Sequence, residues 1–231
     1  MKQICSRLSS GLGSEMTEPA KPTEVYQLRV WIREISPVIW RRLLVRSDST
    51  IADLHYTLQI ALDWSGYHLH QFIIRGKGYG VYQAGGPSFA DNPHQVRLGE
   101  LRLRLKERFF YEYDFGDGWR HEIRVEQRVP LNPKKSYPVC IGGARAGPLE
   151  DCGGPWALMA LREHYSPWKI AERLLGILDH DDWPEHRDLF NEELHLIHYC
   201  LTAAKFDRRA VNRRLKQYAL GDEAWQWSKG G

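Results

Sequence analysis

Residues 109–129 read FFYEYDFGDGWRHEIRVEQRV, two aromatic and β-branched runs separated by the Gly-Asp-Gly of residues 116–118. Such runs favour strands, and an Asp-Gly step between two strands is a strong signal for a hairpin. In the second run Trp119, His121, Ile123 and Val125 alternate with charged residues. Because successive side chains of a strand point to opposite faces, the sequence predicts a solvent face and a buried face, with His121 on the buried one.

The residues that precede this hairpin predict more strands and one helix. VYQLRVWIREI at 25–35 and VIWRRLLVR at 38–46 predict a second strand pair. Apolar residues at helical spacing predict a helix that ends near residues 64–66, and they are Ile51, Leu54, Leu58, Ala61 and Leu62. Ser49 or Thr50 is the expected N-cap, with Asp53 as the capping-box partner. HLHQFIIRG at 68–76 predicts a further strand, which continues into a glycine-rich ribbon.

The residues after the hairpin change in character. Residues 130–155 are rich in Pro and Gly and predict mostly loop. Helical patterns follow at 156–165 and 167–178, and two more begin near Asp182 and Asp207. Strands first and helices last predict an α+β fold, a mainly antiparallel sheet with one early helix packed on it and a C-terminal helical part. We expect a single domain at 24–220, a disordered N-terminal arm at 1–23 and a tail at 221–231, with Met16 as an alternative start to Met1.

Composition limits the class of protein. The chain has 231 residues, 42 % of them hydrophobic, and a formal net charge of +3, which by itself is too weak to indicate nucleic acid. It has no apolar run near the roughly 18 residues of a membrane span, and its start lacks the apolar core of a secretory signal. Four cysteines in a chain of this length are not a disulfide framework. We therefore expect a cytoplasmic protein without a membrane partner. The phosphate-loop, dinucleotide-fold, nucleophile-elbow and His-Glu-x-x-His motifs are all missing from the sequence.

The histidines at the strand ends form the first candidate site. His68, His70 and His121 are expected to point inward near the turn that carries Asp114 and Asp117. Imidazoles with carboxylates suit a divalent metal ion or acid–base catalysis, with Asp114, Asp117 or His121 as catalytic candidates. The alternative is structural, because a histidine at a strand end often only satisfies a neighbouring carbonyl, and an Asp-Gly pair serves turn geometry.

The loop YPVCIGGARAGPLEDCGG, residues 137–154, is the second candidate site. Cys140 and Cys152 are candidate metal ligands, although their spacing is too wide for a zinc knuckle, and buried or reactive thiols are the alternatives. Glu150 is a further catalytic candidate. Asp151, with Gly153 and Gly154, is expected to shape the loop by bonding backbone amides and allowing tight turns.

A basic helix is the third candidate site. KFDRRAVNRRLK at 205–216 carries Arg208, Arg209, Arg213 and Arg214 opposite an apolar face. Two arginines in a first turn oppose the helix dipole, which hints at an anionic partner such as nucleic acid. The alternative is a solvated face paired with the acidic residues of the preceding helix.

The order of these motifs, HLHQF, YDFGDGWRH, EDCGG and FDRRAVNRRL, resembles the plasmid open-reading-frame-three-like proteins, first named from a root-inducing (Ri) plasmid. Some members carry the label of insertion-element passenger protein, TnpR family. The likeness runs from about Tyr26 to Leu215 and implies a compact α+β domain of unassigned biochemical role. One departure is that Leu149 replaces the second of two prolines that usually precede the Glu-Asp-Cys. Resolvase activity is not carried over, because no nucleophilic serine among arginines is found.

Three functions remain open at this stage. The first is a binding or accessory module, associated with mobile genetic elements, whose partner is nucleic acid or another protein. The second is a metal-dependent hydrolase that uses the His/Asp cluster, and the third is a structural domain in which these residues form a buried polar network. The small-molecule ligand and the identity of any metal are not indicated by the sequence.

Overall fold

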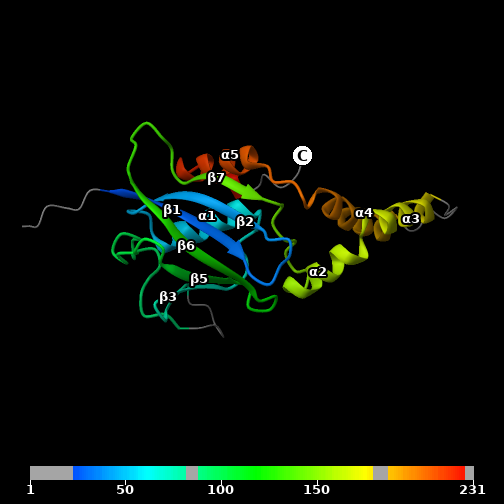
Figure 1. The fold of residues 1–231 in the computed structure, drawn as a ribbon, viewed down its shortest axis with the longest axis horizontal. Helices are drawn as coiled ribbons and strands as arrows, with labels where there is room; N and C mark the ends of the chain where they lie inside the picture. Colours follow the sequence, from blue (N-terminus) through cyan, green and yellow to red (C-terminus); the bar gives the residue numbers. More distant parts are fainter. Residues whose placement is uncertain (1–22, 82–87, 179–186, 227–231) are drawn as a thin grey trace, which may run out of the picture.

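The structure, a computed structural model, describes residues 23–81, 88–178 and 187–226. Within them, strands form one antiparallel sheet in the order β4-β3-β5-β6-β1-β2-β7. The strands are Glu24–Ile32 (β1), Trp40–Arg46 (β2), His70–Ile74 (β3), Lys77–Tyr79 (β4), Arg108–Tyr113 (β5), Trp119–Pro130 (β6) and Val139–Ala144 (β7). The α+β class and the mainly antiparallel sheet are confirmed (Figure 1).

The β5–β6 hairpin shows the predicted alternation of buried and exposed side chains. Its register places Tyr111 opposite His121 and Tyr113 opposite Trp119. Trp119, His121, Ile123 and Val125 are all fully buried. The charged residues of the other face form cross-strand ion pairs, which are Arg108–Glu122, Arg120–Glu112, Arg42–Glu126 and Arg128–Glu24. The outer face of the sheet is therefore charged but largely neutralised.

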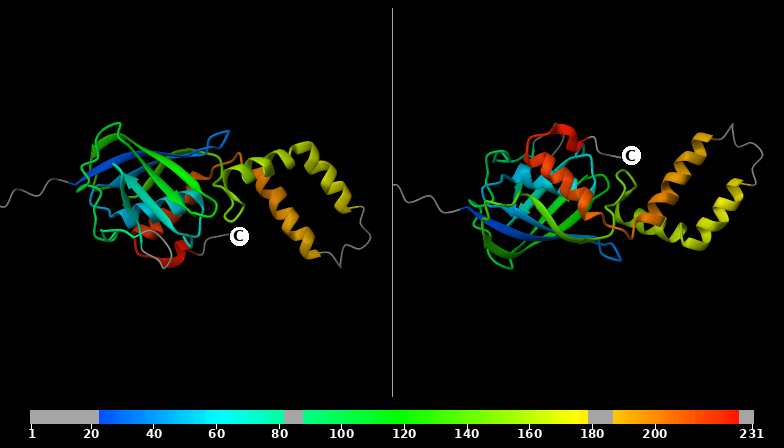
Figure 2. Two further views of the ribbon diagram at one scale, coloured as in Figure 1. Left: turned by 90° about the horizontal axis from the view of Figure 1, so that it is seen from below. Right: turned by 90° about the horizontal axis from the view of Figure 1, so that it is seen from above.

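Helix α1 (Ile51–Leu62) lies on the inner face of this sheet (Figure 2). The predicted capping box is present, since the Thr50 side chain accepts from the backbone of Asp53 and the Asp53 carboxylate accepts from the backbone of Thr50. The helix is buried on nearly every side, more than one amphipathic face requires. The C-terminal segment covers its other side, where the rings of Tyr218 and Trp225 pack on Tyr56.

Residues 130–155 are mostly loop, as predicted, but they also contain strand β7, which the sequence did not indicate. This strand pairs with β2 at the sheet edge, and its other side meets helix α5 (Arg208–Ala219). The side chain of Asn212 accepts from the backbone N–H of Cys140 and donates to the Cys140 carbonyl, as a neighbouring strand would. The strand character of this glycine-rich segment therefore comes from its partners and not from its own propensity.

A helical arm, residues 154–178 and 187–202, projects from the sheet body (Figures 1 and 2). It consists of α2 (Gly154–His164), α3 (Pro167–Leu178) and α4 (Arg187–Thr202), and it has a small core of its own around Tyr165, Ile170 and Ile197. The chain returns to the sheet body where the N–H of Ala146 donates to the carbonyl of Ala203, at 3.0 Å.

The ends of the chain complete the description. Residues 1–22, including the predicted N-terminal arm and Met16, lie outside the described residues. Residues Glu223–Gln226 of the predicted tail form a short 3-10 helix, η1, whose Trp225 packs against the core. None of the helices in the described part of the chain combines the length and apolar character needed to cross a bilayer.

Candidate functional site

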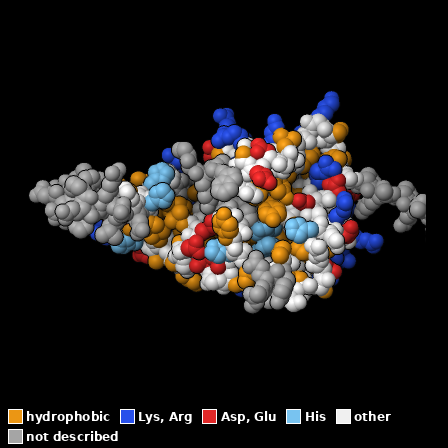
Figure 3. All heavy atoms as spheres, turned by 180° about the vertical axis from the view of Figure 1, so that it is seen from behind, with side chains coloured by type: hydrophobic (Ala, Val, Ile, Leu, Met, Phe, Trp, Pro, Cys, Tyr) orange, Lys and Arg blue, Asp and Glu red, His pale blue; other side chains and the backbone are white. Residues whose placement is uncertain are grey.

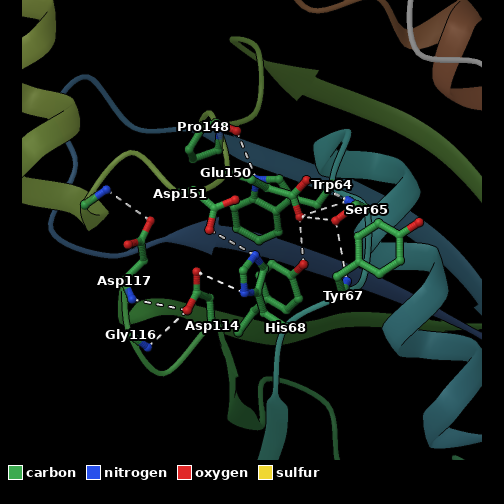
Figure 4. A network of polar contacts seen from close by, with 12 residues as sticks. Trp64, Ser65, Tyr67, His68, Asp114, Gly116, Asp117, Pro148, Glu150 and Asp151 are labelled. Carbon is green, nitrogen blue, oxygen red and sulfur yellow. Dashed lines mark hydrogen bonds and ion pairs between the residues drawn. The ribbon is translucent and has the colours of Figure 1, made fainter.

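The turn between β5 and β6 holds one carboxylate in a fixed orientation. Asp114 adopts a positive φ of 55°, and its Oδ1 accepts from the backbone N–H groups of Gly116 (3.0 Å) and Asp117 (3.3 Å). Its own N–H donates to the carbonyl of Leu69, which holds the segment before β3 against the turn. Oδ2 of Asp114 is thereby directed toward His68 (Figure 4).

The loop of residues 148–154 is fastened over the end of α1. The indole N–H of Trp64 donates to the Pro148 carbonyl, and the carboxylate of Glu150 accepts from the backbone N–H and the hydroxyl of Ser65. The Tyr113 hydroxyl also donates to Glu150, at 2.7 Å. Burial and the Glu150 carboxylate raise the pKa of Tyr113, so the phenol remains a donor. Glu150, a catalytic candidate from the sequence, is thus occupied in holding the loop.

Two glycines bring this loop onto the β5–β6 turn. The N–H of Gly153 donates to the Asp117 carboxylate at 3.2 Å. Gly154 has a φ of +82°, and a Cβ there would lie 2.2 Å from the Asp117 carbonyl oxygen. Only glycine permits both the conformation and the approach. Asp117 is therefore a contact between turn and loop, and Gly153 and Gly154 allow the loop to approach the turn closely.

His68 lies between the two segments that these contacts hold together. Its Nδ1 is 3.7 Å from Oδ2 of Asp114, and its Nε2 is 3.3 Å from Oδ1 of Asp151. One donor atom from each of these three residues lies within 4.8 Å of the other two. Asp151 has a positive φ of 56°. Asp151 was expected only to bond backbone amides, but its carboxylate faces the histidine.

The three-residue cluster is open to solvent on one side. The exposed fraction of the side chain is 74 % for Asp151, 28 % for His68 and 11 % for Asp114. Acidic side chains gather around a histidine on the face seen in Figure 3. No lysine or arginine among the described residues forms an ion pair with Asp114 or Asp151. The cluster therefore combines uncompensated negative charge with an imidazole, a combination that favours a bound cation.

The structure does not bring the three predicted histidines together. His70 and His121 lie on β3 and β6, with β5 between them, so two strand spacings of about 4.8 Å separate their backbones. His70 stacks on His55 of α1, with ring centroids 3.6 Å apart. His121 is fully buried, and its Nδ1 lies 3.2 Å from the Tyr111 carbonyl. The expected set of His68, His70 and His121 is thus replaced by His68 with two aspartates.

The cysteines lie outside this cluster. Cys140 is buried on β7, and its thiol donates to the Gly142 carbonyl at 3.3 Å. Burial, followed by the carboxylate of Asp117, raises the pKa of the Cys152 thiol to about 11. Neither Cys140 nor Cys152 belongs to the group of donor atoms around His68.

The predicted arginine face is only partly exposed. Arg208, Arg209 and Arg213 are exposed on α5, as expected. Arg214 is not on the exposed face that the sequence predicts for it. Its guanidinium is turned inward, pairs with Asp63 at the end of α1 and donates to the Trp225 carbonyl. The helical period places residue 214 between the apolar and polar faces, and the carboxylate of α1 draws it to the buried side.

The sequence reasoning missed one group of polar residues between α1 and the sheet. The Gln59 amide donates to the Tyr111 hydroxyl, which in turn lies 2.8 Å from Nδ1 of His55. His55 and Gln59 are one helical turn apart, and this spacing was the available signal. All three side chains are buried, so we assign them to the core and not to the site.

The comparisons with known proteins give relatives without an assigned role. The chain is 32 % identical over 136 residues to an uncharacterized protein, y4hQ, of Sinorhizobium fredii, a match that covers 57 % of this chain and 68 % of that protein. It is similar to the crystal structure of a protein of unknown function, MM3350, from Methanosarcina mazei, with a TM-score of 0.61 and 27 % identity over 82 % of this chain and 97 % of that one. The sequence pattern of the plasmid pRiA4b ORF-3-like proteins matches residues 24–201. With most of its length matched, the chain belongs to the plasmid pRiA4b ORF-3-like protein family.

Proposed function

We propose that this domain is a binding module whose site holds a divalent metal ion through His68, Asp114 and Asp151. The observation that carries the proposal is that one donor atom from each residue lies within 4.8 Å of the other two. The segments that supply the ligands are independently anchored, Asp114 by its own turn and Asp151 by Glu150 and the paired glycines. A site anchored in this way needs little reorganisation when a cation binds.

The donor set indicates which cations to expect. One imidazole and two carboxylates suit Mn²⁺, Fe²⁺, Co²⁺ and Zn²⁺ better than Ca²⁺, which prefers six to eight oxygen ligands. Nδ1 of His68 faces the anchored Asp114, and Nε2 faces the exposed Asp151. Three protein ligands leave coordination positions open to solvent, so a bound metal would present them to a further ligand.

Metal titration of the tag-free, chelator-treated full chain tests this proposal. We expect one Mn²⁺ or Zn²⁺ per chain by calorimetry, and a melting temperature that rises with metal concentration because the ion binds the folded state. His68→Gln and Asp151→Asn should each weaken the affinity by about tenfold or more, which is the lower range for disturbing a metal shell.

Glu163→Gln is the matched control, because Glu163 is an exposed carboxylate of α2 outside the cluster. It should leave metal affinity unchanged. Two results would refute the proposal, namely no binding tighter than about 1 mM, or equal affinity in Asp151→Asn and the unmodified protein. In either case the cluster would be a polar network that orders the turn.

Metal-dependent hydrolysis is a second candidate, and the open coordination positions favour it. A metal ion lowers the pKa of its bound water and supplies a nucleophile near neutral pH. The metal-loaded protein is expected to cleave uncharged activated esters more readily than phosphate esters, because two carboxylates surround the ion. A chromogenic ester series with and without Mn²⁺ measures this, and rates identical in Asp151→Asn would exclude it.

A further inference from the structure

Helix α5 carries cations that the rest of the molecule does not neutralise. Five exposed basic residues lie within twelve positions, and they are Lys205, Arg208, Arg209, Arg213 and Lys216. None of them forms an ion pair within 4 Å with any other described residue, whereas four arginines of the outer face of the sheet, Arg42, Arg108, Arg120 and Arg128, are paired with glutamates. The only carboxylate in this stretch, Asp207, is engaged as the N-cap of α5.

The basic residues form a stripe along one side of α5. At 100° per residue, Arg209, Arg213 and Lys216 fall within an arc of about 60° and span about 10 Å of the helix axis. The buried side of the helix carries Arg214, which pairs with Asp63, and Leu215, while Asn212 at the flank of the stripe fixes the helix to β7. The basic stripe therefore lies on the exposed side of α5, a helix that packs beside β7 at the edge of the sheet (Figure 1).

Two arginines of α5 lie at the end of the helix where positive charge is unfavourable. Arg208 and Arg209 occupy the first turn, where the helix dipole disfavours positive charge. The Arg208 guanidinium donates to the Ile141 carbonyl, whereas the Arg209 guanidinium forms no hydrogen bond within the described part of the chain. An external anion at this end would remove the conflict, since both the guanidinium groups and the first turn of the helix attract negative charge.

We propose that the basic stripe of α5, formed by Arg209, Arg213 and Lys216 with Lys205 and Arg208 beside it, binds the phosphodiester backbone of nucleic acid. One DNA strand carries a phosphate every 3.4 Å or so along its axis, so about 10 Å of helix meets about three phosphates. Arginine matches phosphate geometry through bidentate hydrogen bonds. Contacts to phosphates carry no base information, so we expect this binding to be independent of sequence.

This surface is separate from the metal cluster in the chain. Residues 205–216 lie beyond the residues 24–201 that the family pattern matches, so the match itself gives the stripe no role. The proposal stands whether or not His68 binds a metal. The two can be tested separately, because nucleic-acid binding is measured in the presence of chelator.

Fluorescence anisotropy of the full chain tests the stripe, with a short labelled DNA duplex and a labelled single-stranded RNA as probes at increasing salt. We expect the logarithm of affinity to fall linearly with the logarithm of salt concentration. The triple variant Arg209→Gln, Arg213→Gln, Lys216→Gln should bind about tenfold more weakly at low salt, and its salt slope should be shallower by about three. Glutamine preserves helix propensity, and an unchanged melting temperature checks the fold.

The matched control removes three exposed cations elsewhere, Arg104→Gln, Lys106→Gln and Lys169→Gln. It should keep nearly full affinity and slope. Equal losses in the two triple variants would overturn the proposal, since only net charge would then matter. Tighter binding to vesicles of phosphatidylcholine and phosphatidylserine than to either nucleic acid would also overturn it and assign the stripe to lipid headgroups.

Discussion

Gly154→Ala is expected to destabilise the protein by about 3 kcal/mol and to abolish the metal binding that we propose for His68. Two effects add at this position. An alanine at a φ of +82° is strained by about 1–2 kcal/mol, and its Cβ would lie 2.2 Å from the Asp117 carbonyl oxygen. The turn and the loop must separate to relieve the contact, and this movement carries Asp151 away from Asp114. Urea denaturation and metal titration of the same variant measure both consequences.

Two other glycines separate these effects. Gly118 has a φ of +70° with nothing within 4 Å of its Cβ position, so Gly118→Ala carries backbone strain alone and should lose about 1 kcal/mol. Gly176 lies inside α3 with free space around it, and Gly176→Ala should stabilise the arm slightly. If Gly154→Ala is no worse than Gly118→Ala, the close approach of loop and turn does not hold the site together.

Acidification is expected to unfold the protein through its buried histidines. Burial lowers the pKa of His70 and of His121 to about 4, and it also lowers the pKa of His55, which the stacked His70 ring lowers further. The unfolded chain takes up protons near pH 6.5, while the folded chain does not until about pH 4. Stability is therefore complete above pH 6.5 and is lost as the pH falls through this window, by about 1.4 kcal/mol per pH unit for each histidine.

The variant His70→Phe tests this pH dependence. Phenylalanine keeps an aromatic ring against His55 and removes one titrating group. The plot of unfolding free energy against pH should become shallower by about one proton between pH 6.5 and pH 4. His164→Gln, at an exposed position in α2, should leave the slope unchanged. Identical slopes for His70→Phe and the unmodified protein would contradict the assignment of acid sensitivity to this histidine.

Those parts of the fold that depend on local pattern could be predicted. The β5–β6 hairpin, the capping box of α1 and the N-cap Asp207 each follow from residues a few positions apart. Strand β7 could not, because its pairing with β2 and its contact with Asn212 are non-local. Arg41 is a similar case, since its buried guanidinium bonds only to backbone carbonyls, which a sequence does not display.

The candidate site, too, could be predicted from the sequence only where local pattern decides the outcome. Side-chain parity placed His121 on the buried face, and the structure agrees. The alternation of side chains along a strand does not give the order of strands in the sheet. It therefore could not reveal that β5 lies between the strands of His70 and His121. The partnership of His68 with Asp151 depends on a loop brought over the sheet by Glu150 and the paired glycines. Only the three-dimensional path of that loop identifies Asp151 as a potential ligand.

The junction at the base of the helical arm has a consequence for variation among relatives. The chain departs and returns at one place, where Ala146 bonds Ala203 and the Tyr199 hydroxyl donates to the Gly147 carbonyl. Insertions and deletions beyond this junction alter the reach of the arm while leaving the strand order intact. The outer helices can therefore change in length and in surface residues during evolution while the sheet keeps its fold.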